Sequence, residues 1–183
     1  PFEMAVRAIL GQQVTVKAAR TLAKRLVEAF GHPAQTPFEA LAHTFPSPRT
    51  IVDLPSPIED RLGPLGITGA RARCIRALAQ ALEDGTVELS TAADAQQQMK
   101  RLLALPGFGP WTVQYVAMRA LGWPDAFPHT DFGVKKALAP LGPREIVEFS
   151  QAWQPWRSYA TISLWNALSE ETINTVTIGG RKT

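Results

Sequence analysis

The chain has 183 residues, of which 45% are hydrophobic and 19% are charged, a balance that is typical of a folded domain and excludes a disordered one. Its formal net charge of +3 permits an anionic partner without requiring one. Cys74 is the only cysteine, which excludes an internal disulfide and a multi-cysteine zinc or iron–sulfur site. No run of 18 apolar residues occurs, so we expect no membrane span.

Apolar residues recur at helical spacing along most of the chain. Residues 2–30 follow this pattern, with an interruption at residues 11–13 (GQQ), and Gly31 and Pro33 end it. Further helices are expected, in chain order, at residues 38–43, 49–52, 58–62, 70–82, 92–104, 110–120, 132–139, 143–151 and 156–168. Strand signals are almost absent before residue 171, so the predicted fold class is all-α.

A short turn at residues 105–109 (LPGFG) joins two of these helices. Gly107 and Gly109 are able to adopt positive φ, and Pro110 suits the first position of a helix. Such a turn leaves amide groups beside a helix N-terminus, which attracts phosphate, and Lys100 and Arg101 lie one turn upstream. A tight loop without a ligand is the alternative. The compact spacing favours phosphate binding.

Four segments together carry a family resemblance. They are residues 2–14 (FEMAVRAILGQQV), 105–112 (LPGFGPWT), 132–135 (FGVK, after an acidic residue) and 153–160 (WQPWRSYA). Through them residues 1–170 resemble the helix-hairpin-helix DNA glycosylases, and in particular the bacterial DNA-3-methyladenine glycosylase II group. The resemblance implies two intertwined helical lobes with the active site between them, and a hairpin at about residues 95–120.

The resemblance also implies an activity and a partner. The chain is expected to hydrolyse the N-glycosidic bond of alkylated purines of the 3-methyladenine type in duplex DNA, by base flipping, and to leave an abasic site. It would need no cofactor and no metal. Its partner would be double-stranded DNA containing alkylated bases. It would act as a monomer, away from membranes, in the bacterial cytoplasm at the nucleoid.

Aromatic residues are the first candidates for binding the base. Trp111 and Tyr115 lie four residues apart on one expected helix and so share a face, and Trp165 on a later helix offers a further ring. Core packing is the alternative for such a stripe. An N-alkylated purine is a flat cation, which aromatic faces attract by about 0.5–2 kcal/mol. The family's pocket aromatics also fall on these three positions, whereas residues 153–159 are assigned mainly to the core.

Asp131 is the candidate catalytic residue, since it stands at the start of the helix expected at 132–139. A simple helix cap is the alternative, and the two roles are compatible because the amides at a helix start favour an ionised carboxylate. An ionised acid would stabilise the positive charge that develops on the deoxyribose. Strand-cutting relatives carry a lysine at the position of Trp111, so the resemblance implies a monofunctional hydrolase.

The resemblance places further residues against DNA. Gln12 matches a polar residue of the pocket or minor groove, and Gln13 matches the residue inserted into the duplex, a leucine in one relative. The full set of expected DNA-binding residues is Gln13, Lys100, Arg101, Gly107, Phe108 and Gly109. In relatives the hairpin carbonyls hold a monovalent cation, which here would fall near residues 103, 105 and 108.

The ends of the chain give further expectations. The chain begins at Pro1 without a signal-peptide pattern, so we expect a fragment of a longer protein, without the β-rich domain that precedes the helical part in the family. Residues 171–183 change in composition and are expected to form a strand, a disordered tail or a cloning remnant. Two other functions stay open at this stage: a glycosylase for another damaged base, and a non-catalytic helix-hairpin-helix DNA-binding module.

Overall fold

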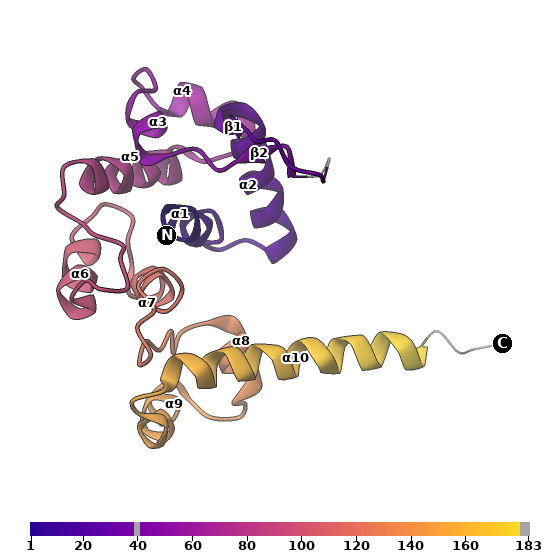
Figure 1. Cartoon of the computed structure of the whole chain (residues 1–183). Helices are drawn as coiled ribbons and strands as arrows, with labels where there is room; N and C mark the ends of the chain where they lie inside the picture. The colour runs from indigo at the N-terminus through magenta and orange to yellow at the C-terminus, as the bar shows by residue number, and fades with distance from the viewer. Residues whose placement is uncertain (39–40, 180–183) are drawn as a thin grey trace. The chain divides into compact units, whose positions relative to one another are not determined.

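The computed structural model of the protein describes residues 1–38 and 41–179, with side chains described up to residue 169. The chain divides into two compact units, unit 1 at Pro1–Gly122 and unit 2 at Trp123–Thr183 (Figure 1). The all-α prediction is confirmed, because helices dominate both units and the described strands are two residues long. No helix within the described residues is both long and apolar enough to cross a bilayer.

Unit 1 carries the N-terminal helices and the hairpin. Its helices are α1 (Phe2–Leu10), α2 (Val16–Phe30), α3 (Pro48–Val52), α4 (Glu59–Leu62), α5 (Gly69–Glu83), α6 (Ala95–Leu103) and α7 (Pro110–Arg119), with a 3-10 turn η2 at Gly63–Leu65. The expected interruption at residues 11–13 separates α1 from α2. Thr15 then begins α2 by accepting a hydrogen bond from the Ala18 amide at 3.2 Å, which satisfies one of the free donors at the helix start.

The core of unit 1 lies around α1. Apolar residues at helical spacing, among them Val6, Ile9 and Leu10, are fully buried on this helix, and α1 packs against α2, α5 and α7. On α5, Ile75 and Leu78 are fully buried in turn. Because α1 is central, residues 11–13 at its C-terminal end lie against the hairpin turn that precedes α7.

The prediction of a helix at residues 38–43 is wrong for the residues of this range that the structure describes. His43–Thr44 forms β2, which pairs antiparallel with β1 (His32–Pro33), and residues 39–40 lie outside the described residues. The Thr36 hydroxyl accepts from the Phe38 amide at 3.2 Å and donates to the Phe38 carbonyl at 2.9 Å. Such local side-chain bonds favour a turn over a helix.

Unit 2 has a small core of its own. Its elements are α8 (Phe132–Ala137), α9 (Pro143–Phe149), a 3-10 turn η3 (Ser150–Trp153) and α10 (Arg157–Gly179). Phe127, Val134 and Ile146 are buried together, and Trp153 and Leu164 pack against them. The core assignment of the aromatic segment therefore holds for Trp153. It is wrong for Trp156 and Tyr159, which are 57% and 61% exposed.

Two polar contacts fix the start of α10. Arg157 donates two hydrogen bonds to Asp125, at 2.7 and 2.6 Å, and the Ser158 hydroxyl donates to the Trp123 carbonyl at 2.7 Å. The helix then continues to Gly179, past the boundary at residue 170 where the sequence predicted a change to a strand or a disordered tail (Figure 1). Residues 171–179 are therefore helical, and the last four residues of that predicted tail lie outside the described residues.

Candidate functional site

The hairpin turn depends on one glycine in particular. Gly107 has a φ of +84°, a region that residues with a Cβ rarely adopt, and an added Cβ would lie 3.0 Å from both Cβ and Sγ of Cys74. Gly109 differs from the prediction, because its φ is −91° and a Cβ there would meet open space. The turn therefore requires glycine at position 107, whereas position 109 has room for a side chain.

The backbone of the turn offers two hydrogen-bond donors. Within the described part of the chain, the N–H groups of Gly107 and Gly109 have no protein partner, whereas the Phe108 amide donates to the Leu105 carbonyl at 3.2 Å. The Phe108 side chain is buried and anchors the turn, so only its backbone is left for a ligand. Lys100 is exposed and Arg101 is half-buried in the last turn of α6, and neither forms an ion pair with a described residue.

Cys74 supports the hairpin from α5. Its side chain is buried against Gly107, and burial raises the pKa of the thiol to about 12. A thiol with this pKa stays protonated near neutral pH and is therefore a poor nucleophile. The structure assigns Cys74 to packing.

Gln12 connects the end of α1 to the hairpin. Its side-chain Nε2 donates to the Gly107 carbonyl at 3.0 Å and to the Thr112 hydroxyl at 2.9 Å. Its backbone carbonyl accepts from Arg71 on α5. The adjacent Gln13 is exposed and has a φ of +53°, which is uncommon for a residue with a side chain. This bridging role of Gln12 was missed in the sequence, because nothing local indicates that residue 12 lies beside residue 107.

Trp111 and Tyr115 share a face of α7, as their spacing predicted. Their ring centroids lie 5.3 Å apart with an interplanar angle of 31°, and both side chains are half-buried. Met118, one turn further on, is buried and belongs to the core. The pair therefore forms a short aromatic surface at the N-terminal end of α7, next to the hairpin turn.

Asp131 caps α8, and three donors of unit 2 bond one of its carboxylate oxygens. Its Oδ1 accepts from the Gly133 amide at 2.8 Å, from the Val134 amide at 3.1 Å and from the Trp165 indole N–H at 2.9 Å. The helix-cap role is confirmed. Because backbone and side-chain donors meet on one oxygen, the carboxylate has a fixed orientation, which a purely electrostatic catalytic group requires.

Trp165 reaches this carboxylate because residue 133 is glycine. A Cβ at position 133 would lie 2.8 Å from Cδ1 and 3.0 Å from Nε1 of Trp165, which is closer than real contacts allow. The sequence predicted Trp165 as a ring for the base. The structure shows that its indole edge bonds Asp131. Neither that bond nor the need for Gly133 was visible in the sequence, although FGVK was one of the segments that carried the resemblance.

The predicted site residues fall in two groups. Gln12, Trp111, Tyr115 and the hairpin belong to unit 1, whereas Asp131 and Trp165 belong to unit 2. Within each unit the structure brings the predicted residues together. No group of three or more His, Cys, Asp or Glu side chains in the described ranges is arranged to hold a metal ion.

Comparison with known proteins gives consistent matches. The model of the HhH-GPD superfamily of base excision DNA repair proteins matches residues 6–145. Over 170 residues the chain is 46% identical to the Mycobacterium tuberculosis protein named probable bifunctional transcriptional activator/DNA repair enzyme AlkA, covering 91% of this chain and 33% of that protein. It is 35% identical to DNA-3-methyladenine glycosylase 2 of Escherichia coli, covering 90% of this chain and 56% of the relative. The chain thus spans between a third and three fifths of these relatives' lengths.

A solved structure shares the fold. The 3-methyladenine DNA-glycosylase from Archaeoglobus fulgidus superposes with a TM-score of 0.75, covering 90% of this chain and 56% of that one. At 24% identity this match carries information on the fold alone. It extends the likeness beyond residues 6–145 to most of the described chain.

Proposed function

Because the chain belongs to the HhH-GPD superfamily of base excision DNA repair proteins, we propose that it is a DNA glycosylase that hydrolyses the N-glycosidic bond of alkylated purines in duplex DNA. Of the two relatives named above, one is named a probable DNA repair enzyme and the other a DNA-3-methyladenine glycosylase. The observation that carries the proposal is the orientation of Asp131, whose Oδ1 is held by three donors. A module that only binds DNA has no need of a carboxylate fixed in this way.

The proposed reaction breaks the bond between C1′ of the deoxyribose and the purine nitrogen. The bonding electron pair leaves with the base and neutralises the positive charge that alkylation placed on it. Positive charge develops on C1′ and the ring oxygen, and the Asp131 carboxylate stabilises it electrostatically. Water then bonds to C1′ and releases its proton to Asp131 or to solvent. No second carboxylate is needed as a general acid, since the leaving base already carries a positive charge.

The aromatic surface of α7 supplies the proposed selectivity. A flipped alkylated purine is a flat cation, and the tilted rings of Trp111 and Tyr115 offer it electron-rich faces. A neutral purine gains stacking energy there but no cation–π attraction. The preference for charged bases therefore follows from the type of side chain, without any requirement for a specific hydrogen bond to the base.

The hairpin and the Gln13 turn supply the proposed grip on DNA. The N–H groups of Gly107 and Gly109 suit a phosphate of the strand that carries the damage, with Lys100 and Arg101 adding positive charge. In this proposal the exposed Gln13 fills the space that the flipped base leaves. Gln12 holds the Gln13 turn to the hairpin, and in this proposal it is also a polar residue of the pocket or minor groove.

We also propose that the enzyme is monofunctional and acts as a monomer on nucleoid DNA in the bacterial cytoplasm. Strand-cutting relatives use a lysine Schiff base where this chain has Trp111, and an indole has no nucleophilic amine. Water is then the only nucleophile in the proposed reaction, and the product is an intact strand with an abasic site.

A base-release assay tests the proposal. Duplexes carrying 3-methyladenine, 7-methylguanine, 8-oxoguanine or uracil are incubated with the protein, and released bases are separated chromatographically. We expect release of the two methylated purines and strand breaks only after alkali. Release of 8-oxoguanine or uracil in preference to the methylated purines would instead support the other-lesion alternative. Binding without any release would support the non-catalytic module.

A further inference from the structure

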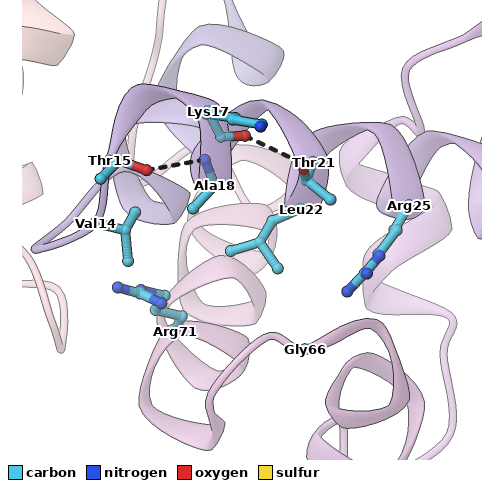
Figure 2. A pocket seen from close by; sticks show the side chains of 9 residues that line it. All are labelled: Val14, Thr15, Lys17, Ala18, Thr21, Leu22, Arg25, Gly66 and Arg71. Carbon is cyan, nitrogen blue, oxygen red and sulfur yellow. Dashed lines mark hydrogen bonds between the residues drawn. The ribbon is translucent and has the colours of Figure 1, made fainter.

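A groove on unit 1 is not used by the proposed reaction. It lies between α2 on one side and Gly66 and the start of α5 on the other, and it has a volume of about 480 Å³ (Figure 2). Val14, Ala18 and Leu22 contribute apolar surface to it, Arg25 and Arg71 supply guanidinium groups, and Lys17, Thr15 and Thr21 lie along its edge on the side of α2. The groove thus combines an apolar lining with three cationic side chains.

These three cations keep their charge uncompensated. Arg25 donates to the Leu65 carbonyl at 3.1 Å and Arg71 donates to the Gln12 carbonyl, and both acceptors are neutral groups. Among the described residues, none of the three forms an ion pair with a carboxylate. Two other cations of unit 1 do form ion pairs, Lys24 with Glu28 at 3.5 Å and Arg73 with Glu59 at 2.5 Å. Three cations without a described carboxylate partner therefore give the groove a positive potential.

The turn at Gln12–Gln13 links this groove to the hairpin within unit 1. The Gln12 side chain bonds the hairpin at Gly107, whereas the Gln12 backbone carbonyl bonds Arg71 of the groove lining. Val14 and Thr15, directly after Gln13, also line the groove. The exposed Gln13 therefore stands between two surfaces that each suit phosphate: the amides of the hairpin and the cations of the groove.

We propose that this groove binds the sugar–phosphate backbone of the strand opposite the damaged base. The inference rests on the proposed function, because it assumes that Gln13 enters a duplex while the hairpin holds the damaged strand. A residue inserted into a duplex has one backbone on either side of it. With the hairpin on the damaged strand, the groove beyond Gln13 meets the other strand. Guanidinium and ammonium groups bind phosphate oxygens, and the apolar lining suits the faces of deoxyribose.

The test combines protein variants with neutral phosphates. The probe is a duplex with a non-cleavable abasic analogue in one strand, prepared unmodified, with methylphosphonates flanking the analogue, or with methylphosphonates in the opposite strand. The variants are Lys17→Gln and Arg25→Gln. Lys24→Gln is the matched control, because it removes the same charge from the same helix outside the groove. Arg71 is left intact since it also holds the Gln12 turn.

We expect each groove variant to bind the unmodified duplex about threefold or more weakly, with the slope of log affinity against log salt reduced by about 1. This loss of affinity should disappear when the opposite strand carries the neutral methylphosphonates, and it should persist when the methylphosphonates flank the analogue in the damaged strand. Lys24→Gln should bind like the wild type. A loss that disappears only with the neutral damaged strand, or groove variants that bind like Lys24→Gln, would overturn the inference.

The same preparation separates this inference from the proposed function. Wild-type protein is assayed in parallel for release of 3-methyladenine. If it releases the base while the groove variants show no coupling to the opposite strand, only the groove assignment fails. If it releases no damaged base at all, the proposed function fails and the groove assignment fails with it.

Discussion

At the scale of single residues, the donors that bond Oδ1 of Asp131 come from two sources. Three donors reach Oδ1, two from the backbone at the start of α8 and one from the Trp165 indole. The two amides belong to the helix cap and would be present in any capped helix. The indole bond is additional, and it exists because position 133 has no side chain. Trp165 is thus a positioning residue for the carboxylate.

Replacing Trp165 with phenylalanine tests this role. Trp165→Phe keeps an aromatic ring and removes the N–H that bonds Oδ1. A hydrogen bond to a charged group contributes about 1.5–3 kcal/mol, so we expect base release under single-turnover conditions to slow about tenfold or more. DNA affinity should change little. Rates measured by quenched-flow at saturating enzyme, together with binding of an abasic-analogue duplex, give both values.

Gly133→Ala provides an independent check on the same bond. Its Cβ would push the indole away from Asp131, so the variant should slow base release to a similar degree. Combined with Trp165→Phe it should add little, because both changes remove one interaction. Full additivity in the double variant would contradict the positioning role and assign the effect of each change to a separate cause.

At the scale of elements, the hairpin contains two glycines with different requirements. Gly109 has ordinary φ and open space, so Gly109→Ala should leave the free energy of unfolding nearly unchanged. It should still weaken binding to every duplex alike, because the new methyl group would obstruct a phosphate approaching the amide. Urea unfolding and fluorescence anisotropy on damaged and undamaged duplexes measure the two effects.

Gly107→Ala is the contrasting variant. Positive φ and the approach to Cys74 should lower the free energy of unfolding by about 1–3 kcal/mol.

If Gly109→Ala binds DNA as well as the wild type, or loses affinity only for damaged duplexes, the amide at position 109 does not hold a phosphate.

The start of α10 depends on the ion pair between Asp125 and Arg157. The Arg157 hydrogen bonds hold the pKa of Asp125 below its ordinary value. The folded state therefore binds this proton less readily than the unfolded state. The resulting stabilisation is complete above the ordinary pKa of about 3.9 and is lost as pH falls towards the lower pKa of the folded state.

Asp125→Asn should remove this pH dependence. Between about pH 5 and pH 3, we expect the wild type to lose more free energy of unfolding than the variant does. Chemical unfolding at several pH values measures the difference, and other carboxylates cancel because both proteins contain them. Parallel pH profiles would mean that the ion pair does not stabilise the fold.

At the scale of the whole molecule, the sequence was informative wherever a pattern was local. Helical spacing, the glycine–proline turn and the cap at Asp131 each lie within a few residues, and the structure places helices, turn and cap accordingly. The bond from Gln12 to Gly107 joins residues 95 positions apart, and that from Trp165 to Asp131 spans 34. Such contacts depend on packing and leave no periodic signal in one sequence.

Two predictions from the sequence were wrong, the burial of Trp156 and Tyr159 and the change of structure at residue 171. Trp156 and Tyr159 are as aromatic as Trp153, and only the direction in which α10 and its preceding turn present them decides that they are exposed. The boundary predicted at residue 171 rested on a change in amino-acid composition. It did not end the helix, since threonine and isoleucine are only modestly unfavourable in a helix. Composition predicted a boundary that the backbone does not show.

The division into two units suggests a division of roles. In our proposal, unit 1 holds DNA through the hairpin and the groove, whereas unit 2 carries the carboxylate that stabilises the transition state. A change confined to the Asp131 carboxylate should therefore affect chemistry without affecting DNA affinity. Asparagine at this position keeps an oxygen that accepts the three hydrogen bonds while removing the negative charge.

Single-turnover release of 3-methyladenine by Asp131→Asn is the most direct measurement of this claim. We expect a rate at least about 100-fold below that of the wild type, with the dissociation constant for an abasic-analogue duplex changed by no more than about twofold. A variant that releases the base at the wild-type rate would contradict it, and so would one whose loss of activity is matched by an equal loss of DNA affinity.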